Sequence, residues 1–147
     1  QIMNSRAFTL VELLVTIGII AVLSAIILFS ISQYINKSKD AAIAGNLSVL
    51  VPAGEVYYDH NSGNGYGAGD ENNPNSFCGS STVKNSFSQI SSVKHCMANV
   101  NAWSACAQEF VNKNRAFCVD SRGYKREICN SDCSASITSC PDLGNCP

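Results

Sequence analysis

The feature that most constrains this chain is an apolar run near its N-terminus, from Phe8 to Phe29, in which Glu12 is the only ionisable side chain. About 20 apolar residues are enough to cross a bilayer as a helix. The core of a cleaved signal peptide is usually shorter and is followed by a small-residue cleavage site. Here a helical pattern continues past Phe29 instead. The sequence therefore predicts that residues 8–29 form a membrane-spanning helix that the chain retains.

The helix is expected to continue beyond the membrane as an amphipathic segment over residues 30–59. Its apolar side chains recur three and four residues apart, which is the spacing of one helix face. Pro52 lacks the N–H that would bond to the carbonyl of Ser48, so we expect a kink or break near Leu50–Val51, with helix resuming to about Tyr58. The stripe consists of Ile31, Ile35, Ile43, Leu47 and Leu50, while Lys37, Lys39 and Asp40 lie off it.

All eight cysteines follow the apolar run, within the polar residues 60–147. An even number of cysteines in a short soluble region indicates up to four disulfides, formed in an oxidising compartment outside the cytoplasm. Eight cysteines allow roughly a hundred pairings, and the sequence does not choose among them. Zinc is the weaker alternative, because C-x-x-C pairs are missing and the histidines are only His60 and His95. The disulfide candidates are Cys78, Cys96, Cys106, Cys118, Cys129, Cys133, Cys140 and Cys146.

A glycine- and asparagine-rich segment, residues 60–75, is predicted to be a loop because it has no apolar period. Asp70 and Glu71 within it lack the ligand spacing of a calcium-binding loop. The segment that follows, residues 80–96, is expected to contain a short helix capped by Ser80 or Ser81. Its periodic apolar positions are Val83, Phe87, Ile90 and Val93.

Residues 102–110 and 115–129 are predicted to form strands, the second segment being a hairpin that turns at Ser121–Arg122–Gly123. The tail after Cys129 has few apolar side chains, so its disulfides must hold it in place. The predicted fold class is therefore α+β: a long N-terminal membrane-spanning helix packed on a small antiparallel sheet, with a disulfide-rich C-terminal region. Alternation along the hairpin's first strand puts Ala116, Cys118 and Asp120 on one face, and Phe117 and Val119 on the other.

The sequence carries little that indicates catalysis or nucleic-acid binding. Its formal net charge is −1, which gives no basic footprint for DNA or RNA. Neither a glycine-rich phosphate loop nor a G-x-S-x-G nucleophile elbow occurs. We therefore expect a protein that is not an enzyme and that has no cofactor, metal or directly bound nucleic acid.

Glu12 is the unusual residue of the membrane segment. A charge at the centre of a bilayer costs about 2.5–3.5 kcal/mol on insertion scales, and less near the edge, where Glu12 lies six residues beyond Arg6. Two explanations are open on position alone. The carboxyl group reaches the interface or is protonated, or it meets a positive partner in an assembly.

The stretch "A-FTLVELLVTIGIIAVLSAII" resembles the N-terminus of type IV pilins and of the related pseudopilins of type II secretion. This resemblance implies that residues 1–7 are a leader cut between Ala7 and Phe8, and that Phe8 is then N-methylated. It also implies that the ammonium group of Phe8 in one subunit pairs with Glu12 of a neighbour during assembly. Two residues differ from the family pattern: Ala7 replaces the usual glycine, which predicts slowed cleavage, and Phe29 replaces a common proline.

The resemblance implies a structural subunit of a pilus or pseudopilus filament, whose use in adhesion, motility, DNA uptake or secretion stays open. Its expected partners are further copies or related pilins, a prepilin peptidase, an inner-membrane assembly platform and membrane lipid. The chain would lie in the bacterial inner membrane with residues 60–147 extracytoplasmic, and afterwards in an extracellular pilus or periplasmic pseudopilus. The alternative is a single-pass membrane-anchored binding domain that does not polymerise.

Overall fold

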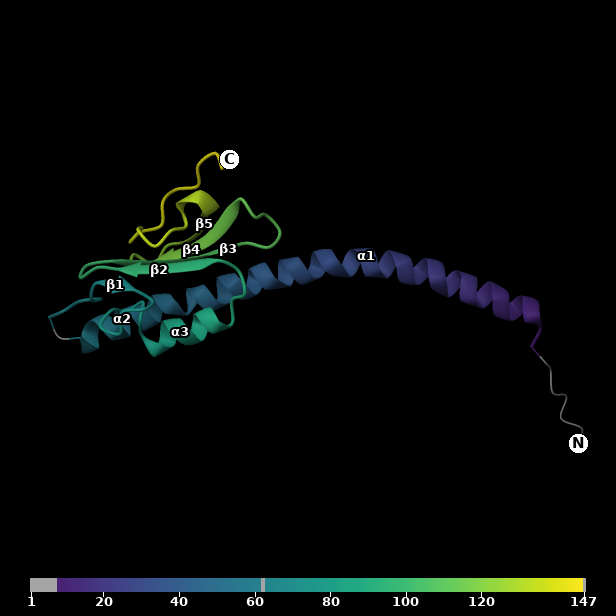
Figure 1. The fold of residues 1–147 in the computed structure, drawn as a ribbon, viewed down its shortest axis with the longest axis horizontal. Helices are drawn as coiled ribbons and strands as arrows, with labels where there is room; N and C mark the ends of the chain where they lie inside the picture. Colours follow the sequence, from purple (N-terminus) through teal and green to yellow (C-terminus); the bar gives the residue numbers. More distant parts are fainter. Residues whose placement is uncertain (1–7, 62, 147) are drawn as a thin grey trace, which may run out of the picture. The chain divides into compact units, whose positions relative to one another are not determined.

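The computed structural model describes residues 8–61 and 63–146. The predicted leader, residues 1–7, lies outside these ranges. The chain divides into two compact units, one ending at Ile35 and the other beginning at Asn36. Helix α1 (Leu10–Ser48) contributes to both units, and the remaining elements all belong to the second (Figure 1).

The first unit consists of the apolar part of α1. Every described side chain from Phe8 to Ile35 is exposed, including all the leucines, isoleucines and valines. A helix satisfies its own backbone hydrogen bonds, which is what crossing a bilayer requires. The segment Leu10–His60, which comprises α1 and α2 (Leu50–His60), is long and apolar enough, by length and composition, to contain a membrane span.

The helices of the second unit show the predicted interruption before Pro52. Helix α1 ends at Ser48, and α2 (Leu50–His60) begins after Val49, which adopts a turn. Pro52 therefore lies in the first turn of α2, where a helix tolerates the missing N–H. The inward face of both helices carries Ile43, Leu47 and Leu50, each almost fully buried.

Helix α3 (Ser81–Ser88) begins at the predicted cap, because the Ser80 hydroxyl accepts a hydrogen bond from the Val83 N–H at 3.4 Å. Helix α3 is shorter than the stretch over which apolar residues recur at helical spacing. Ile90 is buried beyond the helix end, but Val93 is 59% exposed, so assigning Val93 to the helix face was wrong. Pairing with a neighbouring strand, which local periodicity does not register, converts the following residues into strand β2.

The sheet is an antiparallel meander of five strands in the order β1-β2-β3-β4-β5 (Figure 1). The predicted strand and hairpin are confirmed as β3, β4 and β5, whereas β1 lies in the predicted loop and β2 in the predicted helical segment. The strands are β1 (Gly69–Asp70), β2 (Lys94–Ala98), β3 (Trp103–Gln108), β4 (Arg115–Asp120) and β5 (Lys125–Cys129), followed by the short 3-10 helix η1 (Asn130–Asp132).

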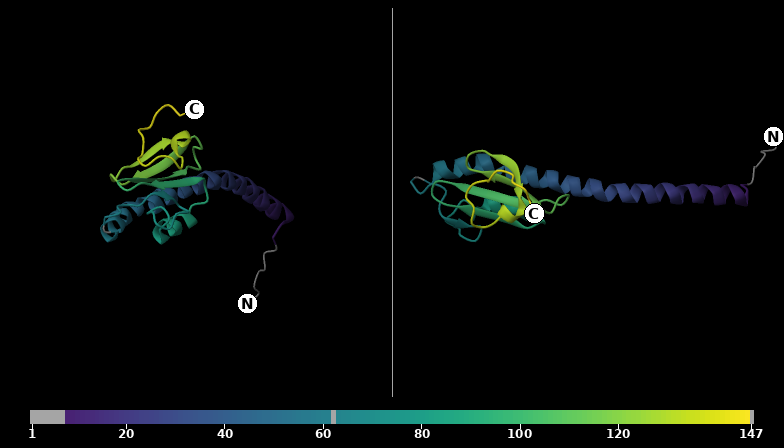
Figure 2. Two further views of the ribbon diagram at one scale, coloured as in Figure 1. Left: turned by 60° about the vertical axis from the view of Figure 1, so that its left-hand side comes forward. Right: turned by 90° about the horizontal axis from the view of Figure 1, so that it is seen from above.

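Both faces of the sheet are covered, by the helices on one side and by the C-terminal tail on the other (Figure 2). The alternation predicted for β4 is confirmed. Phe117 and Val119 belong to the helix-side core, and Ala116 and Cys118 to the tail-side cluster. Trp103, fully buried on β3, lies at the centre of the helix side against Phe77.

Four disulfides join all eight cysteines. One links the segment before α3 to β2, and three attach the tail to β3, β4 and β5. Cysteines bonded in this way are not available as thiolate ligands for zinc. The pairs are Cys78–Cys96, Cys106–Cys133, Cys118–Cys140 and Cys129–Cys146.

Candidate functional site

The first turn of α1 contains a reciprocal capping box between Thr9 and Glu12. The Thr9 hydroxyl accepts a hydrogen bond from the backbone N–H of Glu12 at 3.3 Å. In return, one carboxylate oxygen of Glu12 accepts hydrogen bonds from the backbone N–H and the hydroxyl of Thr9, both at 2.8 Å. This is the T-x-x-E arrangement that satisfies free N–H groups at a helix start. Glu12 therefore has a partner within its own chain.

The other carboxylate oxygen of Glu12, Oε1, accepts no hydrogen bond from any described residue. Phe8, the predicted new N-terminus, precedes the cap residue and is 79% exposed. The capping box thus holds the Glu12 side chain at the helix end through one oxygen, and no described residue donates to the other. The predicted cleavage residue Ala7 lies outside the described residues.

Further along the same helix, the exposed apolar surface contains a groove. Gly18 leaves a shallow groove on the helix, lined also by Val15, Ile19, Val22 and Leu23. An added Cβ at Gly18 would meet no other atom within 4 Å. Small residues on membrane helices allow a second helix to approach closely. Gly18 therefore leaves open space on the surface of this helix.

Within the second unit, the exposed side of the helices carries an uncharged stripe. Ala42, Gly45, Val49, Pro52 and Val56 are exposed and recur at intervals of three and four residues. This spacing is that of the contact seam between two packed helices. A helix that is apolar on both faces is typical of one that is covered on both sides. The stripe is available for contact with a further helix.

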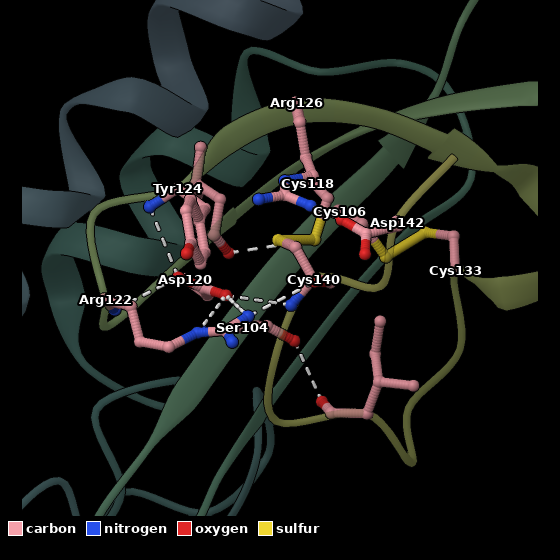
Figure 3. Close-up of a disulfide and its surroundings, with 12 residues drawn as sticks. Ser104, Cys106, Cys118, Asp120, Arg122, Tyr124, Arg126, Cys133, Cys140 and Asp142 are labelled. Atoms are coloured by element: carbon pink, nitrogen blue, oxygen red, sulfur yellow. Dashed lines mark hydrogen bonds and ion pairs between the residues drawn. A yellow bond between two sulfur atoms is a disulfide. The ribbon is translucent and has the colours of Figure 1, made fainter. Parts of the chain in front are cut away.

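The tail side of the sheet is organised around Asp120, a fully buried carboxylate on β4. Its Oδ2 accepts hydrogen bonds from the Cys140 N–H at 2.9 Å and from the Arg122 guanidinium at 2.6 and 3.1 Å. Its Oδ1 accepts from the backbone N–H groups of Arg122 at 3.0 Å and Tyr124 at 3.3 Å. Figure 3 shows these groups converging on Asp120 beside the Cys118–Cys140 disulfide. Asp120 thus fixes the hairpin turn and the tail together.

Two guanidinium groups enclose the ring of Tyr124 next to this network. The Arg122 and Arg126 guanidinium carbons lie 4.5 and 4.1 Å from the ring centroid. Arg126 also forms an ion pair with Asp142 of the tail. Hydrogen bonding to Asp120 raises the pKa of Arg122 above its usual value. Both cations are therefore engaged within the chain, and the cluster stabilises the tail.

Sequence reasoning did not identify Thr9 or the role of Asp120. The T-x-x-E pattern was a readable signal for Thr9, because a capping box depends only on local spacing. For Asp120, strand alternation predicted the correct face. Its main-chain partner Cys140 lies twenty residues further on, where no local pattern would reveal it.

A family model, the prokaryotic N-terminal methylation motif, matches residues 2–28 of the chain. This motif is the signature of type IV pilin and pseudopilin precursors. No curated protein and no solved structure is significantly similar to the chain. The motif indicates a structural protein rather than an enzyme, and in general it implies prepilin peptidase and other pilins as partners. Together with the apolar helix, it fits anchoring in a membrane.

Proposed function

We propose that this chain is a structural subunit of a type IV pilus or pseudopilus, assembled through its apolar N-terminal helix. The observation that carries the proposal is Glu12, an acid set in an exposed apolar helix four residues after Phe8, inside the methylation motif. A carboxylate at this place disfavours contact with lipid unless a partner compensates its charge.

The assembly step requires the bond between Ala7 and Phe8 to be cut. Hydrolysis frees the α-amino group of Phe8, which stays basic after methylation. This ammonium then pairs with Glu12 of a neighbouring subunit through the oxygen left free by the capping box. Pairing compensates two charges at once, so a neighbour in the wrong register leaves both uncompensated. The contact is heterologous and does not close, which is the condition for a filament.

The same proposal assigns a place to each part of the chain. Residues 1–7 are the leader, residues 8–29 lie in the inner membrane before assembly, and residues 30–59 continue the helix outside it. Residues 60–147 are extracytoplasmic, because disulfides persist in oxidising compartments. The assembly platform would draw subunits from the lipid into an extracellular pilus or a periplasmic pseudopilus. The exposed groove at Gly18 and the uncharged stripe support helix contacts between neighbours.

One observation favours a second candidate, a single-pass anchored domain that does not polymerise. The capping box already gives Glu12 two hydrogen-bond donors within its own chain. A carboxylate satisfied in this way tolerates the membrane edge without any neighbour.

Two substitutions at Glu12 separate these candidates. Glu12→Gln keeps an oxygen that can accept from the Thr9 N–H, since glutamine also serves in capping boxes, but it removes the charge. Glu12→Ala removes both. If Glu12 pairs with a neighbour's ammonium, both variants should enter the membrane and neither should appear in sheared filaments. If Glu12 is only a cap, Glu12→Gln should behave like the parent chain.

N-terminal sequencing of subunits from sheared filaments provides the second test. A mature chain that begins at Phe8 is the expected result. Filament subunits that still carry residues 1–7 would refute the pairing mechanism, because their α-amino group would lie away from Glu12.

A further inference from the structure

A pocket of about 620 Å³ lies in the second unit, at the end of α2. Its walls come from four places in the chain: the end of α2, the segments 64–68 and 74–75, and Val100 in the turn between β2 and β3. Small-molecule sites usually range from about 300 to 1,000 Å³, so the volume suits a compact ligand.

The pocket is held open by a rigid backbone frame. Tyr66 donates its N–H to the Val100 carbonyl at 3.1 Å, and Phe77 donates to the Tyr66 carbonyl at 2.7 Å. Gly65 has φ +57°, and a Cβ there would lie 1.9 Å from the Val100 oxygen. Only glycine permits this approach and this backbone conformation. Gly65 and Tyr66 are therefore positioned by contacts within the chain, without help from a ligand, which favours binding.

A second close backbone contact lies on the other side of the pocket. A Cβ at Gly67 (φ +68°) would lie 2.1 Å from the Asn75 carbonyl oxygen, so these two loop segments are also in direct contact. The Cys78–Cys96 disulfide fixes the adjoining segment to β2. The two loop segments that line the pocket, 64–68 and 74–75, are thus both connected to the sheet, one through Val100 and the other through the Cys78–Cys96 disulfide.

The described residues that line the pocket carry no charge; three asparagines and Tyr57 supply its polar groups, and Ala68, Pro74 and Val100 are apolar. Asn61 donates its amide N–H to the Gly65 carbonyl at 2.9 Å, which leaves its amide oxygen as an acceptor. The amides of Asn64 and Asn75 are exposed and form no side-chain hydrogen bond with any described residue. Each offers both a donor and an acceptor. The half-buried ring of Tyr57 adds an aromatic surface.

We propose that this pocket binds an uncharged carbohydrate. Sugar hydroxyls donate and accept hydrogen bonds, as do the amides of Asn64 and Asn75, and the C–H groups of a sugar ring can pack against Tyr57. An anionic ligand would find no cation among the described lining residues. A peptide is usually bound through a free strand edge, an apolar groove or a charged terminus, none of which the described lining provides.

Few contacts and an open site imply weak binding by one subunit. If the chain is displayed in many copies, as the proposed filament would display it, such sites gain strength by multivalency. Binding by a single subunit does not depend on that assembly, so the site can be tested on the unassembled chain.

The test uses the full oxidised chain in lipid nanodiscs, applied to an array of immobilised neutral oligosaccharides with their sialylated and sulfated counterparts. Saturation-transfer NMR with the strongest neutral glycan then measures its affinity and its contact with aromatic protons. The Asn64→Ala/Asn75→Ala double variant should weaken binding by about tenfold or more. The control is Asn85→Ala, which removes an exposed amide on α3 outside the pocket.

The expected result is binding of a neutral glycan that the double variant loses and Asn85→Ala retains. The proposal is overturned if the array shows no neutral glycan bound, if charged glycans bind better, or if the double variant binds like the parent. It is also overturned if an uncharged glycine–serine peptide competes equally well. None of these outcomes bears on filament assembly, which the Glu12 variants test separately.

Discussion

The backbone N–H of Cys140 donates a hydrogen bond to the buried carboxylate of Asp120, 2.9 Å away. The same Cys140 is bonded through its sulfur to Cys118, two residues before Asp120 on β4. The tail is therefore attached to one strand twice, covalently and through a buried acceptor. The hydrophobic cluster on that side is small and consists largely of disulfide-bonded cysteines, so this polar attachment adds to the apolar contacts that hold the tail.

Asp120→Ala should destabilise the second unit strongly. The substitution leaves the Cys140 N–H without its acceptor, and a buried unsatisfied donor costs about 1–3 kcal/mol. It also releases the turn N–H groups of Arg122 and Tyr124. Chemical denaturation of the parent and variant chains would measure the difference. The control Asp142→Ala removes an exposed ion pair with Arg126 and should change the free energy of unfolding by less than about 1 kcal/mol.

The disulfide connectivity can be tested chemically. Proteolysis of the oxidised chain at acidic pH, followed by mass spectrometry, should recover the four linked pairs described above. Removing the terminal bridge with Cys129→Ser/Cys146→Ser should lower stability by about 2–4 kcal/mol, since it closes a loop of 17 residues. Recovery of a Cys129–Cys133 peptide, or of alkylated free cysteines, would contradict the arrangement.

The parts of the fold that could be predicted were those with a strong local period. The apolar helix, the interruption before Pro52 and the β4–β5 hairpin all follow from spacing or from a turn signal. Strands β1 and β2 could not be found in this way. β1 has only two residues, and the pairing of β2 with β3 depends on residues that are close in space rather than in sequence.

The residues of the candidate sites also differ in whether the local sequence could reveal them. Glu12 stood out because an acid in an apolar run is conspicuous by itself, and Thr9 could have been found from the capping-box spacing. The asparagines of the pocket could not have been selected, because Asn64 and Asn75 are ordinary loop residues until the contact at Gly67 brings their segments together. The composition of residues 60–75 predicted a loop, but the cavity arises from the backbone contacts of Gly65 and Gly67, which composition does not reveal.

Two glycines of the same helical region should respond oppositely to substitution by alanine. At Gly54 a Cβ would lie 2.5 Å from Nε1 of Trp103, a fully buried side chain that cannot move aside. Gly54→Ala should therefore destabilise the chain by about 1–3 kcal/mol through overpacking. At Gly45 nothing lies within 4 Å of the added atom, so Gly45→Ala should stabilise it by about 0.5–1 kcal/mol.

Thermal unfolding of the unassembled chain in nanodiscs would compare the two glycine variants, with Trp103 fluorescence as a second readout. Gly54→Ala should shift the emission because it displaces the indole. If Gly54→Ala were as stable as Gly45→Ala, α2 would not contact Trp103 as described.

Glu109, which follows β3, should make stability depend on pH. Partial burial raises its pKa above the usual 4.5, and the negative charges of Glu127 and Asp40 add to this effect, while Arg115 opposes it. A raised folded-state pKa means that the folded chain holds this proton more tightly than the unfolded chain does. The contribution to stability is therefore full below pH 4.5 and is lost as pH rises through the raised folded value.

Glu109→Gln mimics the protonated side chain and should remove this dependence. Compared with the parent, the variant should be more stable at pH 7, by less than about 1 kcal/mol because the site is partly open to solvent. The difference should shrink as the pH approaches 4.5. Denaturation curves at several pH values would measure it. Asp59→Asn, which removes one exposed negative charge on α2, should not reproduce the gain. If both variants showed the same pH profile, net charge rather than the surroundings of Glu109 would be responsible.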